Sequence, residues 1–183
     1  MRAQALRRPW ILGVLAALGV TVLIGAVLVD NLDAARRRDA AQAWQTHTLR
    51  VIADIQHLSS VLQAGEIGER GWLLGGDPAY LALYRSSRHD GPPLIGRLDA
   101  ETADNPAQRA ALQSLRSLIV DREAQMDATL VARSGGGAVT PGVSSAGLAT
   151  MEAARASLES MAAQENRLLV ERTGVEARAE QAG

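Results

Sequence analysis

The sequence contains no cysteine, no lysine and no phenylalanine, and aromatic residues make up only 3% of it. The absence of cysteine excludes disulfides, thiolate metal sites and a cysteine nucleophile. With so few aromatic residues, a core has to be built from Leu, Ile, Val, Ala and Met, which suits long helices better than a sheet. All 19 basic residues are arginine, which together with heavy use of Ala, Leu and Gly is typical of a GC-rich bacterial genome. The composition therefore predicts an all-α fold.

The sequence also lacks the patterns that mark nucleic-acid binding, cofactor binding or catalysis. A formal net charge of −1 leaves no excess of basic residues for a polyanion. There is no Gly-rich phosphate loop, no His-Glu metal motif and no Gly-x-Ser-x-Gly elbow. His47 and His57 are ten residues apart, about 15 Å along a helix and on different faces, so they do not form a metal site. We expect no enzyme activity, no cofactor and no nucleic-acid partner.

A run of 20 uncharged residues, Trp10 to Val29, predicts one transmembrane helix. At 1.5 Å per residue this run spans roughly 30 Å, the thickness of a bilayer core. The alternative is a cleavable signal peptide, whose apolar region is only about 7–15 residues long and lies close to a small-residue cleavage site. Here the run is longer and the polar segment 30–33 follows it, so we favour an uncleaved anchor.

The residues beside this segment do not fix its orientation. The positive-inside rule counts Lys and Arg near the ends of a span and largely ignores Asp. Three arginines precede the span and three follow it: Arg2, Arg7, Arg8, Arg36, Arg37 and Arg38. From the residues alone, the two topologies are therefore tied.

Residues 34–75 contain no proline and predict the first helix of a bundle, about 63 Å long if all 42 residues are helical. The segment Gly75-Gly76-Asp77-Pro78 is expected to end it, with Gly at the C-terminal cap, Asp77 as the next N-cap and Pro78 in the following first turn. A heptad seam of the kind that packs helices side by side runs along this helix. Its members are Trp44, Thr48, Val51, Ile55, Leu58, Leu62, Gly65, Glu69 and Trp72.

Three more helices are predicted after this turn. In the second, Gly91-Pro92-Pro93 is expected to break or kink the helix, because proline removes a backbone donor and clashes with the preceding turn. Asp104-Asn105-Pro106 marks the start of the third helix, again as a cap followed by proline. A flexible Gly/Ser/Pro linker at 134–147 precedes the fourth helix, which runs from about Leu148 towards Glu180.

The last two helices carry apolar seams as well. The third has Leu112, Leu115, Ile119, Arg122, Met126 and Leu130 on one seam, and the fourth has Met151, Leu158, Met161, Leu168 and Val175. The overall pattern predicts an elongated up-down four-helix bundle over residues 34–181, preceded by one transmembrane helix.

Polar residues and glycines near the end of the first helix each have two interpretations. Glu66 and Arg70, four residues apart, share a helix face. They form either a signal-sensitive ion pair or, as we favour, an exposed pair or a cap that orders the turn around Gly71. Gly65, Gly68 and Gly71 each cost roughly 1 kcal/mol relative to Ala inside a helix, and we favour close helix packing over a kink as the reason.

Further polar residues lie on the predicted helix faces. Tyr80 and Tyr84 share a face, and we favour core packing with a hydroxyl at the rim over a ligand pocket. Arg122, Arg155 and Glu165 fall on or beside apolar seams. They form buried polar contacts between helices or protomers, or they extend outward to solvent along a drifting seam. Both interpretations stay open.

The stretch from Glu66 to Tyr84, EIGERGWLLGGDPAYLALY, resembles the signature of the CHASE-type extracellular sensory domains, third class. The pattern is matched by Glu66, Arg70, Gly71, Trp72, Leu73, Leu74, Gly76, Asp77, Tyr80, Leu81 and Tyr84. Segments around Trp44, Asn105-Pro106 and Met151–Arg172 are similar too, so the resemblance covers about residues 34–175. The sequence departs from the family at Trp72, where Tyr is frequent, at Gly75, where Thr is frequent, and at the Gly91-Pro92-Pro93 segment.

The resemblance implies an extracytoplasmic four-helix sensor between two membrane spans, coupled to a histidine kinase, a cyclase or a chemotaxis module. Residues 1–9 would then be cytoplasmic and the bundle periplasmic, anchored in the inner membrane. A homodimer is expected, since such relays act across a dimer. The cytoplasmic module is absent from these 183 residues, and the helix-like sequence at the end favours truncation before a second span.

The residues that carry the signature are also the candidates for signal relay. They are Glu66, Arg70, Gly71, Trp72, Asp77, Tyr80, Tyr84, Asn105, Pro106, Arg155 and Glu165. The ligand cannot be read from them. The alternative function is a single-span, membrane-anchored helical scaffold or adaptor that binds another envelope protein and relays no signal within this chain.

Overall fold

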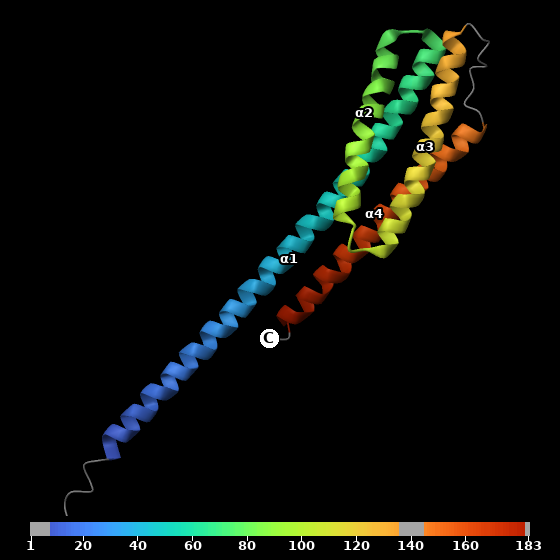
Figure 1. Cartoon of the computed structure of the whole chain (residues 1–183). Helices are drawn as coiled ribbons and strands as arrows, with labels where there is room; N and C mark the ends of the chain where they lie inside the picture. The colour runs from blue at the N-terminus through green and yellow to red at the C-terminus, as the bar shows by residue number, and fades with distance from the viewer. Residues whose placement is uncertain (1–7, 136–144, 182–183) are drawn as a thin grey trace, which may run out of the picture. The chain divides into compact units, whose positions relative to one another are not determined.

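A computed structural model describes residues 8–135 and 145–181 of the chain. It consists of four helices: α1 (Arg8–Gly75), α2 (Pro78–Glu101), α3 (Pro106–Ser134) and α4 (Ser145–Gln181) (Figure 1). No strand occurs in these two described ranges. The predicted all-α fold is confirmed, and the apolar segment and the first bundle helix are parts of the same helix, α1.

The chain divides into two compact units, one ending at Trp44 and the other beginning at Gln45. In the first unit, the large apolar side chains of α1 are exposed from Trp10 to Leu32. A continuous apolar surface of this length is rarely left to water. Among the described residues, α1 is the one helix that is long and apolar enough to cross a membrane, and its apolar part begins at Trp10.

The second unit is a bundle in which the C-terminal half of α1 and the three other helices run in alternating directions (Figure 1). The predicted seam of α1 is confirmed for most of its length, because Thr48, Val51, Ile55 and Leu58 are all buried. Trp44, at the start of the seam, is exposed instead. The core formed around this seam also takes in Leu94, Leu98, Leu112, Leu115, Ile119, Ala154, Leu158 and Met161.

The seams of the last two helices agree with the structure wherever their side chains are described. Every predicted seam residue of α3, from Leu112 to Leu130, is buried. In α4, Met151, Leu158 and Met161 are buried and Leu168 is half-buried. Val175 lies outside the described side chains.

The turn between α1 and α2 has the predicted cap chemistry. Gly76 has φ 69°, a left-handed conformation that favours glycine, and its N–H donates to the Trp72 carbonyl at 2.8 Å. Asp77 is the N-cap of α2, and its Oδ1 accepts from the Ala79 N–H at 2.9 Å. Pro78 occupies the first helical position. The reversal between the two helices is therefore set by three consecutive residues.

The turn between α2 and α3 repeats this arrangement. Asn105 is the N-cap of α3, and its Oδ1 accepts from the N–H groups of Ala107 at 3.1 Å and Gln108 at 3.2 Å. Pro106 follows at the first helical position. Thr102 closes the end of α2 by donating from its backbone N–H to the Leu98 carbonyl at 3.0 Å.

Of the predicted break or kink at Gly91-Pro92-Pro93, the break is wrong, because α2 continues as a helix through both prolines to Glu101. Each proline deprives the carbonyl four residues earlier of its donor, at a cost of about 3 kcal/mol. The prolines lie on the exposed face of α2, where such carbonyls can reach solvent. On the opposite face, Leu94 and Leu98 are fully buried and hold the helix to the core.

The predicted linker is shorter than expected at both ends. Ser134 still belongs to α3, and α4 begins at Ser145 rather than near Leu148. The part of the linker between residues 136 and 144 lies outside the described residues.

Candidate functional site

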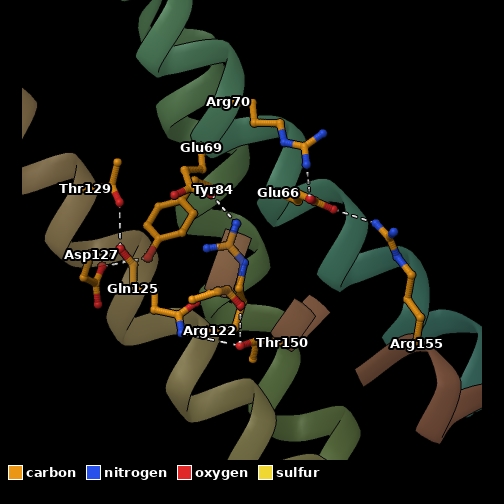
Figure 2. A network of polar contacts seen from close by, with 11 residues as sticks. Glu66, Glu69, Arg70, Tyr84, Arg122, Gln125, Asp127, Thr129, Thr150 and Arg155 are labelled. Carbon is orange, nitrogen blue, oxygen red and sulfur yellow. Dashed lines mark hydrogen bonds and ion pairs between the residues drawn. The ribbon is translucent and has the colours of Figure 1, made fainter. Parts of the chain in front are cut away.

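Glu66 is the centre of an ion-pair network near the α1–α2 turn (Figure 2). Its carboxylate accepts from Arg70 of the same helix at 2.6 Å and from Arg155 of α4 at 2.6 Å, one bond to each oxygen. Glu66 is only 4% exposed, so the interpretation of Glu66 and Arg70 as an exposed surface pair is wrong. A carboxylate buried at this depth is stabilised by its two guanidinium partners. Glu66 therefore connects the first and last helices of the bundle.

Glu69, one helical turn later, makes the equivalent connection to α3. Its Oε2 accepts from Nη2 of Arg122 at 2.5 Å, and both side chains are 6% exposed. Replacing such a buried pair with apolar residues is often neutral, whereas removing one partner costs roughly 3–5 kcal/mol. With Glu66 and Glu69 on one face of α1, two adjacent carboxylates tie α1 to two different helices.

A third polar group joins α2 to α3 through Tyr84. The buried Tyr84 hydroxyl donates to Oδ1 of Asp127 at 2.7 Å. Burial, and next the hydrogen bond to Asp127, raise the pKa of Tyr84 far above its usual value, so the phenol stays protonated. Arg88 pairs with Glu123 at 2.5 Å and with Asp127 at 3.4 Å. Burial also raises the pKa of the Glu123 carboxyl, against the opposing effect of Arg88.

Three glycines in the last turns of α1 allow α2 to approach at the level of this network. A Cβ at Gly68 would lie 2.6 Å from the backbone nitrogen of Tyr84 and 2.7 Å from the Tyr80 carbonyl oxygen. A Cβ at Gly65 would lie 2.6 Å from Oγ of Ser87, and one at Gly71 would overlap the ring of Tyr80. The close-packing interpretation of these glycines is confirmed. Backbone contact at Gly68 brings Glu66 and Glu69 directly beside α2.

A cavity of about 350 Å³ lies beside this network. Its buried lining residues come from all four helices, and its exposed lining residues come from α2 and α3, so it opens between those two helices. Gly91 is buried and Gly96 exposed, and a Cβ built on either would meet nothing within 4 Å. The apolar part of the wall is formed mainly by Leu58, Leu62, Ile95, Ile119, Met126 and Met151.

One buried polar atom of a lining residue lacks a partner. Arg122 is 5% exposed and lines the cavity, and its Nε has no hydrogen-bond partner among the described residues. Buried N–H groups are almost always paired, and an unpaired one costs roughly 1–3 kcal/mol. Arg122 thus keeps one unused donor that is buried among neighbouring atoms.

A separate polar cluster lies beside the α2–α3 turn. The buried Gln108 side chain donates from Nε2 to the Met161 carbonyl at 3.0 Å and to Oε1 of Glu165 at 2.9 Å. Glu165 is buried as well. This cluster joins the first turn of α3 to α4, and it shares no residue with the Glu66 network.

On the α1–α2 side of the bundle, Arg97 forms a two-bond pair with Asp54, at 2.8 and 3.1 Å. The hydrogen bond from Arg97 is the main reason why the pKa of Asp54 lies below its usual value. Burial raises the pKa of the nearby Glu101, whose Oε2 has no partner among the described residues. The bundle thus carries polar contacts along its whole length.

The predicted relay residues fall into distinct places. Glu66, Arg70 and Arg155 meet in one network, and Tyr80 covers Gly71. Trp72 packs on the cluster that contains Tyr84. Asp77, Asn105 and Pro106 set helix ends, and Glu165 binds Gln108 in the second cluster. The interpretation of Arg122 and Glu165 as buried polar contacts between helices agrees with these positions, and Arg155 makes such a contact while half-buried.

The sequence did not point to Arg88, Glu123 and Asp127, which complete the polar contacts of Tyr84. None of them lies on an apolar seam, and their partners are distant in the sequence. The cavity was missed as well. The signal available was a pair of glycines, Gly91 and Gly96, inside a helix.

Comparison with known proteins decides the family. The model of the CHASE3 domain matches residues 41–174. The chain belongs to the CHASE3 family. The predicted resemblance is confirmed, and the CHASE3 match contains the Glu66 network, the Gln108 cluster and the cavity.

CHASE3 domains are sensory domains, so this chain contains a sensory input domain. A solved structure, the sensor domain of the histidine kinase HK9 from Rhodopseudomonas palustris, is similar at 27% sequence identity. The similarity covers 73% of this chain and 94% of that chain, with a TM-score of 0.44. No curated protein matches the chain significantly. Within the described part of the CHASE3 domain, no group of His, Asp and Glu side chains is arranged to hold a metal ion.

Proposed function

We propose that this chain is the extracytoplasmic sensory input domain of a bacterial membrane receptor and that it has no catalytic activity of its own. In this proposal α1 crosses the inner membrane, residues 1–9 are cytoplasmic, and the bundle lies in the periplasm. The receptor acts as a homodimer. Its output is a histidine kinase, cyclase or chemotaxis module that lies outside these 183 residues.

The observation that carries this proposal is the ion pair between Glu66 in α1 and Arg155 in α4. Receptors of this kind would receive and pass on a signal through the first and last helices of the bundle. The buried carboxylate is bonded at once to an arginine of its own helix and to one of the last helix, so it would stay paired with Arg70 if the bond to Arg155 opened. The closed and open forms of the bond to Arg155 would then be two alternatives. Such alternatives allow a small shift or tilt between helices to be biased by a stimulus.

The relay is tested with Glu66→Gln and Arg155→Gln in the chromosomal gene of the source bacterium. Membrane vesicles from each strain are assayed for autophosphorylation and for cyclic-nucleotide formation. We expect each variant to change the basal output several-fold, and the double variant to change it no more than Glu66→Gln alone. Ser114→Ala, an exposed position away from the network, is the matched control and is expected to leave the output unchanged.

Unchanged output in all variants, with normal folding by circular dichroism, would contradict the relay. Isolation of a stoichiometric envelope protein with the same variants would then favour the adaptor function. Topology is tested separately by single cysteines, since the chain has none of its own. Cysteine at position 114 should react with an impermeant maleimide in intact cells, whereas cysteine at position 4 should react only after lysis.

A further inference from the structure

We propose that the cavity between α2 and α3 is a ligand site for a small, uncharged, mostly apolar molecule of one or two rings. This inference rests on the proposed sensory function only in identifying such a molecule as a stimulus. The site itself follows from the glycines of α2, from the volume and apolar walls of the cavity, and from the pairing of its arginines.

The cavity lies beside glycines of α2 that a larger residue could replace without a clash. Gly91 is buried in the middle of α2, and a Cβ there would meet nothing within 4 Å. Alanine would therefore fit without a clash and would favour the helix. The same holds for Gly96. Two helical glycines that face open space keep room for a molecule rather than for a neighbouring helix, in contrast to Gly68, which contacts the α2 backbone.

The volume sets the size of the ligand. A cavity of about 150 Å³ lined by Leu, Ile and Phe is enough to bind benzene. This cavity measures about 350 Å³, and it lies within the range of small-molecule sites. Its walls are mostly apolar, so the larger part of the ligand is apolar as well, with a size of one or two rings.

The arginines in the cavity wall are already paired. Arg88, Arg116 and Arg122 are in the wall, and their ion-pair partners are Glu69, Asp99, Glu123 and Asp127. A ligand carboxylate would have to be desolvated beside arginines whose charges are already compensated. A neutral ligand avoids this cost.

The test uses benzophenone, a neutral two-ring ketone that labels proteins when irradiated. Its excited carbonyl takes a hydrogen from a C–H bond, and the two carbons then join, leaving an alcohol. The full chain in phosphatidylcholine nanodiscs is irradiated with benzophenone, and adducts are mapped by mass spectrometry. We expect adducts at Met126 and Met151, both in the cavity wall. Adducts on residues 10–29 report the probe dissolved in lipid and are the internal reference.

Gly91→Leu is the matched variant, because its side chain fills the cavity without removing a polar group. We expect it to fold and to lower the labelling of Met126 and Met151 by roughly tenfold or more, with labelling of residues 10–29 unchanged. Gly96→Leu provides a second filling variant if Gly91→Leu does not fold. Equal labelling of the two methionines in wild type and filled variants, or none in either, would overturn the proposal.

The neutral class is tested by competition with three one-ring compounds. Ethylbenzene and acetophenone, which are neutral, should both compete better than benzoate, which is charged. Stronger competition by benzoate would overturn the neutral class. Because no output module is involved, a negative result here leaves the vesicle assays of Glu66 and Arg155 unaffected.

Discussion

The carboxylate of Glu66 in α1 accepts a hydrogen bond at 2.6 Å from Arg155 of α4, 89 residues later in the sequence. Its other oxygen is held at the same distance by Arg70, one turn further along α1. The two arginines are not equivalent, because Arg70 stays with Glu66 whatever α4 does. Only the bond to Arg155 depends on the position of α4 relative to α1.

Because Glu66 has a second partner in Arg70, replacing Arg155 should destabilise the bundle less than replacing Glu66. Arg155→Gln leaves Glu66 paired with Arg70 and should lower the free energy of unfolding by about 1 kcal/mol. Glu66→Gln removes both charge-assisted bonds and should cost about 1–3 kcal/mol. The double variant should cost about as much as Glu66→Gln alone, since both changes remove the same bond. Urea unfolding of the full chain in detergent, followed by circular dichroism, measures all three. Strictly additive costs would contradict a shared contact.

The pair of Glu69 and Arg122 predicts a larger effect, because both partners are buried. Arg122→Met leaves the Glu69 carboxylate without its cation and should destabilise the bundle by about 3–5 kcal/mol. The double variant Glu69→Met/Arg122→Met removes both charges and should recover most of this loss. The midpoint of thermal unfolding gives the order of the three proteins. A double variant less stable than Arg122→Met would contradict this prediction. It would show that the pair stabilises the bundle beyond offsetting the cost of burying its own two charges.

Replacing glycine with alanine should stabilise the bundle at Gly91 and destabilise it at Gly68. Gly91→Ala fills open space in α2 and should raise the free energy of unfolding by about 0.5–1 kcal/mol. Gly68→Ala places a Cβ 2.6 Å from the Tyr84 backbone nitrogen, so the helices must move apart at a cost of about 1–3 kcal/mol. Helix propensity is the same in both and cancels in the comparison. Stabilisation at both positions would mean that α1 and α2 are not in backbone contact.

The sequence was sufficient to predict the parts of the fold that depend on local chemistry. Asp77 and Asn105 could be assigned as caps because each precedes proline and carries an oxygen acceptor for the first turn. The apolar seam of α3 could be read from its spacing, although the burial of Arg122 on it stayed open. In each case, the pattern and its structural consequence lie within a few residues.

The remaining features depend on contacts between distant segments. The spacing of Glu66 and Arg70 is the same for an exposed pair as for a buried one, so the role of Arg155 could not be inferred. The prolines of α2 predicted a break or kink, whereas in the structure the packing of Leu94 and Leu98 maintains the helix. With α2 predicted to break there, the cavity beside Gly91 could not be found.

The carboxyl of Glu101 should make stability depend on pH. Burial, and next the charge of Asp54, raise its pKa in the folded protein above the ordinary value of 4.5. A raised pKa means that the protonated form favours folding. This contribution is fully present below pH 4.5 and is lost as the pH rises through the folded pKa. At neutral pH, folding therefore retains a partly buried carboxylate whose Oε2 has no partner among the described residues.

Glu101→Gln mimics the protonated carboxyl at every pH. It should raise the thermal midpoint of the full chain at pH 7 and change it little at pH 3.5, where wild type is protonated in both states. Asp54→Asn is the matched opposite case, because the hydrogen bond from Arg97 lowers the pKa of Asp54. The stabilising contribution of Asp54 is present above its ordinary value of 3.8 and disappears as the pH falls through its lower folded value. Asp54→Asn should therefore destabilise the bundle at pH 7. The same sign of change for both variants at pH 7 would contradict the assignment of burial to one carboxyl and ion pairing to the other.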